Sequence, residues 1–172
     1  RADDAALFRA SPFLMTHDSA TGYIGDEDPR RLVAGVQYLG LLEQLDCGVR
    51  AFDLRLVAQR GDFRDIRYHH TEKKLGTGLG WVSEQTLAAT LPDLVGWARS
   101  HPGELIVLVV SHCCATDYWL NLEWTQLDCW DAGFRQAFRD AGVALQAGRS
   151  CGEIADWTLG EARERGRLEG GG

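Results

Sequence analysis

Residues 49–57 read Val49-Arg50-Ala51-Phe52-Asp53-Leu54-Arg55-Leu56-Val57 and alternate with period two. Such alternation is typical of a β-strand, in which successive side chains point to opposite faces. Arg50 is therefore expected on one face, whereas Asp53 and Arg55 share the other. The pattern places a carboxylate and a guanidinium side by side on one strand.

Helical and extended patterns precede this strand. Residues 13–15 predict a first strand, and the motif Thr16-His17-Asp18-Ser19 follows where it ends. From residue 31 to residue 46, apolar side chains recur every three or four positions, which predicts one amphipathic helix; the stripe is Leu32, Val36, Leu39, Leu42 and Leu45. Gly48 is expected to end that helix.

Strands and helices continue to alternate after residue 57. A turn at residues 60–62 leads to a short strand, residues 66–68, that ends at His69-His70. Residues 84–100 predict a helix in which Pro92 implies a kink or a later start. Residues 105–110 predict a strand buried on both faces, capped by Ser111 and His112. Helical patterns at residues 134–141 and 154–163 complete an order that favours a parallel sheet or a (β/α) barrel.

Composition limits the classes of function. The chain has 172 residues, 45% of them hydrophobic, so we expect one globular domain or part of a larger one. Its net charge of -7 argues against non-specific nucleic-acid binding. The run at residues 105–110 is far shorter than the ~20 residues that cross a bilayer, so any membrane contact would be peripheral.

The beginning of the sequence bears on localisation. The chain starts with Arg1 rather than Met, and no charged segment with an apolar core precedes Ser11. We therefore expect a signal peptide to be absent or already removed. A secreted location and a peripheral membrane location are both compatible with this sequence.

The cysteines predict packing rather than disulfide chemistry. Their count is five, and Cys113 and Cys114 are neighbours. Adjacent Cα atoms lie only ~3.8 Å apart, closer than ordinary disulfide geometry favours. We therefore expect mostly free thiols, and those after the apolar strand should pack as small hydrophobic side chains.

Polar residues follow the predicted strands at their carboxyl ends, and in a (β/α) barrel such ends converge on one site. The set holds two separated imidazoles, one guanidinium and two carboxylates. One imidazole can take a proton from a nucleophile while the other protonates a leaving oxygen. A guanidinium can neutralise the charge of a phosphorane, so the set fits phosphodiester cleavage without a metal.

The ordered motifs resemble a known family. Thr16-His17-Asp18-Ser19, residues 48–55, Tyr68-His69-His70 and His101-Pro102-Gly103-Glu104 with its apolar strand are similar in order and spacing to the X region of bacterial phosphatidylinositol phospholipases C. The likeness covers roughly residues 12 to 112. It implies an α/β fold of the TIM (β/α)-barrel type. It also implies cleavage of phosphatidylinositol or a related phosphodiester by attack of the inositol 2-hydroxyl.

The resemblance assigns roles to individual residues. His17 matches the general base and His70 the general acid. Asp18 matches the carboxylate that supports the acid, Arg55 the arginine that stabilises the phosphate, and Asp53 its acidic neighbour. Calcium-dependent relatives carry acidic residues where this chain has Arg55, so neither a metal nor another cofactor is expected.

His69 and Ser111 are expected to bind substrate, and the choice between His69 and His70 as the acid stays open. Residues 157–163 resemble the segment that precedes the next barrel strand in the family. The chain is therefore expected to be a single domain, residues 1–172, that holds the N-terminal half of an incomplete barrel truncated at its C-terminal end. Such a half leaves uncovered apolar faces and an unpaired edge, so we expect it to fold poorly alone.

Several alternatives compete with this interpretation. The chain could be a catalytically incomplete lipid- or phosphate-binding domain of the same fold. A metal-dependent glycerophosphodiesterase is another alternative, but Arg55 stands where such an enzyme carries an acidic metal ligand. Asp53 and Arg55 could form a structural ion pair. His101 and His112 receive no catalytic role, but a zinc site remains an alternative for His69, His70, His112, Cys113 and Cys114. Three tryptophans, Trp119, Trp124 and Trp130, could pack a long loop or form a membrane-interface patch.

Overall fold

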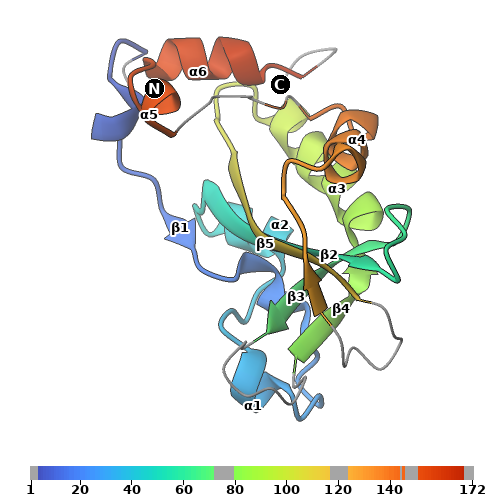
Figure 1. Ribbon diagram of the computed structural model, residues 1–172. Coiled ribbons are helices and arrows are strands. Elements are labelled where there is room, and N and C mark those ends of the chain that lie inside the picture. Colours follow the sequence, from blue (N-terminus) through green and yellow to red (C-terminus); the bar gives the residue numbers. More distant parts are fainter. Residues whose placement is uncertain (1–3, 72–79, 117–123, 144, 146–150, 169–172) are drawn as a thin grey trace.

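The computed structural model describes residues 4–71, 80–116, 124–143, 145 and 151–168. Within these residues a sheet of six strands carries the helices α2, α3 and α4 on one face (Figure 1). The strands are β1 Met15–Thr16, β2 Ala51–Gln59, β3 Ile66–Thr71, β4 Gly80–Thr86, β5 Val107–Thr116 and β6 Trp124–Gln126. The α-helices are α1 Arg31–Ala34, α2 Leu41–Asp46, α3 Leu87–Ser100, α4 Ala132–Asp140, α5 Cys151–Ala155 and α6 Leu159–Gly166, and short 3-10 helices are η1 Phe8–Ala10 and η2 Ser19–Tyr23.

The sheet is mixed and, over the described residues, open. Its order is β4-β3-β2-β5-β6, and β1 pairs with the beginning of β2. The predicted α/β class is confirmed, and β2 is parallel to both β1 and β5. The expectation of an entirely parallel sheet is wrong, because β3, β4 and β6 run antiparallel to their neighbours. The connection from β2 to β3 turns at Arg60 and Gly61, both with positive φ, and is too short for a parallel crossover.

Alternation along β2 separates a core face from a polar face. Phe52, Leu54 and Leu56 belong to the hydrophobic core formed with the helices. Asp53 and Arg55 occupy the intervening positions and therefore point to the other face, as the sequence predicts. A single strand thus joins the packing of the domain to its polar chemistry.

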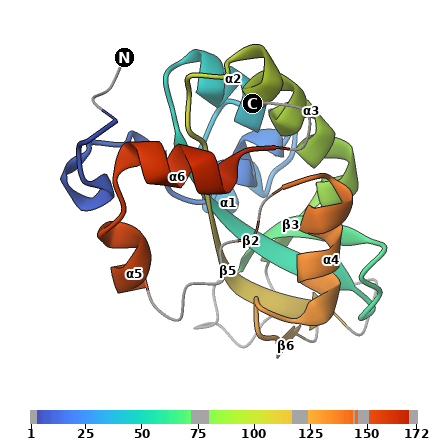
Figure 2. The same cartoon turned by 90° about the horizontal axis from the view of Figure 1, so that it is seen from above.

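Three helices bury the apolar face of the sheet. Their core side chains are Leu41 and Leu45 from α2, Leu87, Leu91 and Leu94 from α3, and Phe134 and Phe138 from α4. Figure 2 shows α2 and α3 side by side above the sheet and α4 beside them. Helix α3 begins at Leu87, after the Thr86 cap, and contains Pro92. The helix thus starts three residues later than residue 84, but Pro92 is not the cause, because it lies inside the helix and the preceding residues 80–86 form β4.

The predicted helix over residues 31–46 is wrong in its middle. The structure has two helices, α1 and α2, separated by residues 35–40. The hydroxyl of Thr21 accepts hydrogen bonds from the backbone amides of Val36 and Gln37, so these amides bind the 3-10 helix η2 instead of helical carbonyls. As a result, Leu32 of the predicted buried stripe is 91% exposed. Gly48 ends α2 as predicted, with φ +94°.

Strand β5 differs from its prediction in length and burial. It continues through Ser111 and His112 to Thr116. Its first half is not buried on both faces, because Val109 is 41% exposed on the face opposite the helices. The apolar run therefore has helical cover on one side only within the described part of the chain.

The prediction of mostly free thiols is wrong for two cysteines. Cys113 on β5 forms a disulfide with Cys129, and neither Cys47 nor Cys114 takes part in it. Cys114, the neighbour of Cys113 in sequence, is not its disulfide partner, as the close spacing of adjacent Cα atoms predicts. The loop after β6 instead brings Cys129 within a Cα–Cα distance of 5.1 Å.

The two ends of the chain lie side by side. Leu7 forms a β-bridge with Thr158, and the amide of Phe8 donates to the carbonyl of Trp157. Arg9 forms an ion pair with Asp156. The single helix predicted at residues 154–163 is two helices, α5 and α6, because Thr158 caps the start of α6 with a reciprocal capping box.

Two helical glycines test the packing around α4. A Cβ on Gly133 would lie 2.2 Å from the Phe63 ring, which packs edge-on against Phe134, whereas a Cβ on Gly96 of α3 would meet nothing within 4 Å. We expect Gly133→Ala to lower the free energy of unfolding by about 1–3 kcal/mol through overpacking. The matched control Gly96→Ala should raise it by about 0.5–1 kcal/mol through helix propensity. Denaturant unfolding measures both, and equal effects would show that the Phe63 ring moves aside at no cost in stability.

Candidate active site

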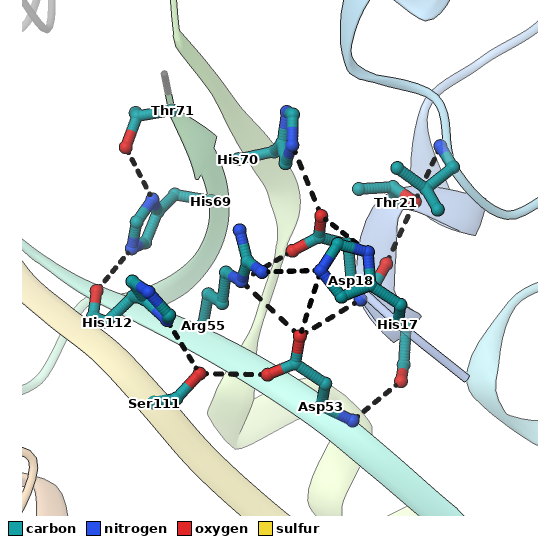
Figure 3. A network of polar contacts seen from close by, with 12 residues as sticks. His17, Asp18, Thr21, Asp53, Arg55, His69, His70, Thr71, Ser111 and His112 are labelled. Atoms are coloured by element: carbon teal, nitrogen blue, oxygen red, sulfur yellow. Dashed lines mark hydrogen bonds and ion pairs between the residues drawn. The ribbon is translucent and has the colours of Figure 1, made fainter. Parts of the chain in front are cut away.

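Side chains from three segments meet on the polar face of the sheet. His17 and Asp18 follow β1, Asp53 and Arg55 come from β2, and His70 comes from β3. Figure 3 shows these side chains turned toward one another around Asp18. The antiparallel return of β3 brings His70 back toward β2, so convergence here does not need a parallel third strand.

Asp18 is the centre of the cluster. Its carboxylate lies 2.6 Å from Arg55 Nε, 3.2 Å from His70 Nε2 and 3.3 Å from His17 Nδ1. The side chain is almost completely buried. Its backbone is left-handed, with φ 48°, and its amide donates to Asp53 Oδ2. One buried carboxylate therefore contacts both candidate acid-base residues and the candidate phosphate-binding residue.

The surroundings of Asp18 keep it ionised. Burial opposes its charge, but the hydrogen bond with His70 and the positive charge of Arg55 outweigh burial and hold the pKa of the carboxyl below its ordinary value. The charge of His17 adds to this effect. At neutral pH, Asp18 is therefore an acceptor for both imidazoles.

The tautomer of His17 follows from its neighbours. Arg55 Nη2 lies 2.8 Å from His17 Nε2, and a guanidinium can only donate, so Nε2 is the unprotonated nitrogen. The proton is on Nδ1, facing Asp18. The side chain is 66% exposed, but its Nε2 is occupied by the contact with Arg55.

Gln44 holds the loop that carries His17 and is absent from the predicted site. Its buried amide nitrogen donates to the carbonyls of Ser19 and Leu39, and its oxygen accepts from the Thr16 hydroxyl. Ser19 Oγ in turn accepts from the amide of Asp53. The sequence signal for this role is a glutamine between Leu41 and Leu45, the two buried leucines of α2. The predicted apolar stripe missed it because it placed Leu42 instead of Leu41 on the buried face.

His69 and His70 have different environments. His69 is buried, and its Nε2 donates to the carbonyl of His112 at 2.8 Å. Burial is the main cause that lowers the pKa of His69 to about 4. At neutral pH it is an uncharged structural group. His70 contacts Asp18 and remains partly exposed, so of the two only His70 reaches the cluster.

Ser111 and His112 extend the cluster along β5. The Ser111 hydroxyl donates to Asp53 Oδ1 at 2.8 Å. His112 Nδ1 lies 2.9 Å from that hydroxyl oxygen, and Figure 3 shows its ring beside Ser111. The sequence gives no periodic signal for His112 at this position, because it occupies a β-bulge.

Among the described residues, the structure does not bring the proposed zinc ligands together in one group. Cys113 is oxidised in the disulfide and offers no thiolate. Among the described residues, His17, Asp18 and Asp53 do form a group with ligand atoms within 4.8 Å of one another. The Arg55 guanidinium lies 2.6 Å from Asp18 and 3.4 Å from Asp53, however, so a cation would compete with a fixed positive charge.

The tryptophans do not gather in one patch among the described residues. Trp119 lies outside them. Trp124 lies against His69, with ring centroids 5.3 Å apart, and Arg135 stacks on Trp130. Packing thus accounts for Trp124, and Trp130 remains partly exposed.

Comparison with solved structures finds the same fold in phosphatidylinositol-specific phospholipase C from Staphylococcus aureus. A mutant of that enzyme has a TM-score of 0.66 and 21% sequence identity, covering 94% of this chain and 48% of that one. Another structure, concerned with modulation of the enzyme's membrane binding, has a TM-score of 0.64 and 21% identity, covering 92% and 47%. This chain thus spans less than half the length of these enzymes. No protein-family model and no curated protein matches the sequence.

Burial of His69 should make stability depend on pH. Because its pKa is about 4 in the folded protein and 6.5 ordinarily, the unfolded chain binds the proton first as the pH falls. The stabilisation is complete above about pH 6.5 and should decrease by up to about 3 kcal/mol as the pH approaches 4. Denaturant unfolding at a series of pH values should show this slope, and it should be shallower in His69→Gln.

His101→Gln is the matched control, since His101 is exposed and stacks on Trp97. The control should keep the slope of the unchanged protein. If His69→Gln does not fold, titration of the His69 ring resonance by NMR in the unchanged protein decides the point. A midpoint near 6.5 would contradict the structural role.

Proposed function

We propose that the chain carries the catalytic residues of a metal-independent phosphodiesterase that cleaves phosphatidylinositol or a related phosphodiester by cyclisation. The observation that carries the proposal is the shared contact of His17 and His70 with Asp18, with Arg55 in the same cluster. The fold common to this chain and the Staphylococcus aureus enzyme supports a phospholipase-like activity. The substrate itself is part of the proposal.

His17 is the proposed general base. Its Nε2 lone pair faces the Arg55 guanidinium at 2.8 Å. A bound phosphate would draw Arg55 into a charge-assisted contact and release that lone pair. The free Nε2 can then accept the proton of a hydroxyl next to the phosphate, while Asp18 stabilises the imidazolium through Nδ1.

His70 is the proposed general acid, in preference to His69. Its Nε2 lies 3.2 Å from Asp18, so the carboxylate stabilises a protonated ring and leaves Nδ1–H for the leaving oxygen. The low pKa of His69, about 4 through burial, makes that residue a poor acid at neutral pH. We assign His69 to the support of the site rather than to contact with substrate.

The proposed reaction balances in one displacement. His17 takes the proton of the neighbouring hydroxyl, whose oxygen forms a bond to phosphorus. The bond from phosphorus to the leaving oxygen breaks, and His70 gives that oxygen a proton. Arg55 neutralises the charge of the phosphorane, and Asp53 orients Arg55 from 3.4 Å. The products are a cyclic phosphate and an alcohol, which is diacylglycerol for a phosphatidylinositol.

The architecture enters the proposal as well. We assign the described strands to the N-terminal half of a TIM-type barrel, consistent with helical cover on only the apolar face of the described sheet and with coverage of 48% of the neighbour's chain. That partial coverage also favours a second candidate. This is a lipid- or phosphate-binding domain of the same fold that lacks turnover.

Exposed apolar side chains next to the His17 loop support peripheral membrane contact. Leu32 and Val33 on α1 and Tyr38 after it are exposed. Gln37 ties this segment to the site, since its side-chain amide donates to the carbonyl of His17. No helix among the described residues is long and apolar enough to cross a bilayer. A lipid head group could therefore enter the site while α1 rests on the membrane surface.

Replacement of either proposed acid-base residue tests the function. His17→Ala and His70→Ala should each lower kcat on phosphatidylinositol in mixed micelles by at least about 100-fold, the usual scale of general acid-base catalysis. Phosphorus NMR of the products should show a cyclic phosphate ester. His101→Ala is the matched control and should retain full activity.

The same assay in EDTA tests metal independence. Because Arg55 supplies the positive charge, chelation should leave the rate unchanged. Activity that returns only with added calcium would overturn the mechanism. Phosphate or lipid binding without any product would favour the second candidate instead.

The membrane surface has its own test. Leu32→Ala combined with Val33→Ala should weaken sedimentation with phosphatidylinositol-containing vesicles by about tenfold, because each change removes exposed apolar contact area. Cleavage of a water-soluble phosphodiester should change little. Trp130→Ala serves as the control on the other candidate surface. A larger loss of binding in that variant would move the membrane contact to the tryptophans.

A further inference from the structure

An extra residue interrupts β5 beside the site. Arg55 pairs with Ser111 and Val57 pairs with Cys114, so two residues of β5, His112 and Cys113, oppose the single residue Leu56 of β2. This arrangement is a β-bulge, a feature that re-aims side chains near active sites. Before the bulge Ser111 points to the polar face, and after it Cys113 points into the core. His112 is the inserted residue.

The backbone of His112 is held in an unfavourable conformation. Its φ is 50°, in the left-handed region that residues with a Cβ rarely adopt. Its carbonyl accepts a hydrogen bond from buried His69, and the next residue is fixed by the Cys113–Cys129 disulfide. The carbonyl of Cys113 also accepts from the amide of Leu127. Backbone conformations of this kind persist where the surroundings determine them and are common at functional sites.

The side chain of His112 is exposed, but its orientation and tautomer are fixed. The carboxylate of Asp53 is the stronger acceptor for the Ser111 hydroxyl proton, so Ser111 Oγ accepts from His112 Nδ1–H. In the neutral ring the lone pair then lies on Nε2. His112 therefore presents a hydrogen-bond acceptor, joined through Ser111 to the residue that orients Arg55.

We propose that His112 is a specificity-determining residue whose Nε2 accepts a hydrogen bond from a hydroxyl group of the substrate alcohol. The inference rests on the proposed function and adds the residue that recognises the alcohol part of the substrate. Arg55 already supplies the positive charge for phosphate, and the acidic Asp53 lies beneath Ser111. An acceptor placed beyond that pair suits the hydroxyl of a polyol better than a second anion.

Two substrates separate alcohol recognition from phosphate chemistry. Glycerophosphoinositol offers several hydroxyls, whereas 2-hydroxypropyl nitrophenyl phosphate offers only the attacking one. In His112→Gly, whose glycine accepts the left-handed backbone, the ratio of kcat/KM for the first substrate to that for the second should fall about tenfold, the scale of one lost hydrogen bond. The loss should lie mainly in KM. An unchanged ratio would overturn the inference.

Ser111→Ala tests the fixed tautomer. It keeps the imidazole but removes the acceptor for Nδ1–H, so the same ratio should fall. His101→Ala is the control and should leave the ratio unchanged. If Ser111→Ala keeps the full ratio of kcat/KM values, the hydrogen bonds from Asp53 through Ser111 to His112 play no part in recognition, and the inference is wrong.

A binding experiment separates this inference from the proposed function. Titration with myo-inositol should shift the His112 ring resonances of the unchanged protein, and His112→Gly should bind myo-inositol about tenfold more weakly. Binding without turnover would refute the proposed reaction and support the role of His112. Turnover of the polyol substrate with equal myo-inositol affinity in both proteins would refute the role of His112 alone.

Discussion

The buried carboxylate of Asp18 is the constraint on which the site depends. A buried negative charge is costly unless positive or donating groups surround it, and Arg55, His17 and His70 meet that need from three directions. The same contacts fix the tautomer of His17 and orient the guanidinium. Gln44 and Ser19 then hold the loop so that Asp18 stays at the sheet. Fold and site are therefore stabilised by one set of interactions.

The sheet contributes through its two faces. Alternation along β2 points Phe52 and Leu54 toward the helices. Asp53 and Arg55 point to the opposite face, so packing of the core fixes the position of these polar groups. A shift of register by one residue would exchange the faces and place charge in the core. This coupling explains how β2 positions the polar cluster accurately.

Local patterns predicted the residues that meet in the cluster, because strand ends and period-two alternation are encoded by neighbours in sequence. The break between α1 and α2 was not predictable in this way, since it depends on the hydroxyl of Thr21 in the separate 3-10 helix η2. The bulge at His112 likewise depends on its register with β2 and on Cys129. Antiparallel β3 was missed although its turn was recognised, because the expected barrel suggested parallel neighbours.

The pairing of the chain ends has a consequence for the order of folding. Arg9 and Asp156 are 147 residues apart in sequence, so their contact closes a loop of almost the whole chain. Loop closure of this size is entropically unfavourable until the intervening segments have condensed. The contact of the N-terminal segment with α5 and α6 should therefore form late in folding and open first on unfolding. Amide protons there would exchange with solvent faster than those of β2, by local opening that leaves the sheet intact.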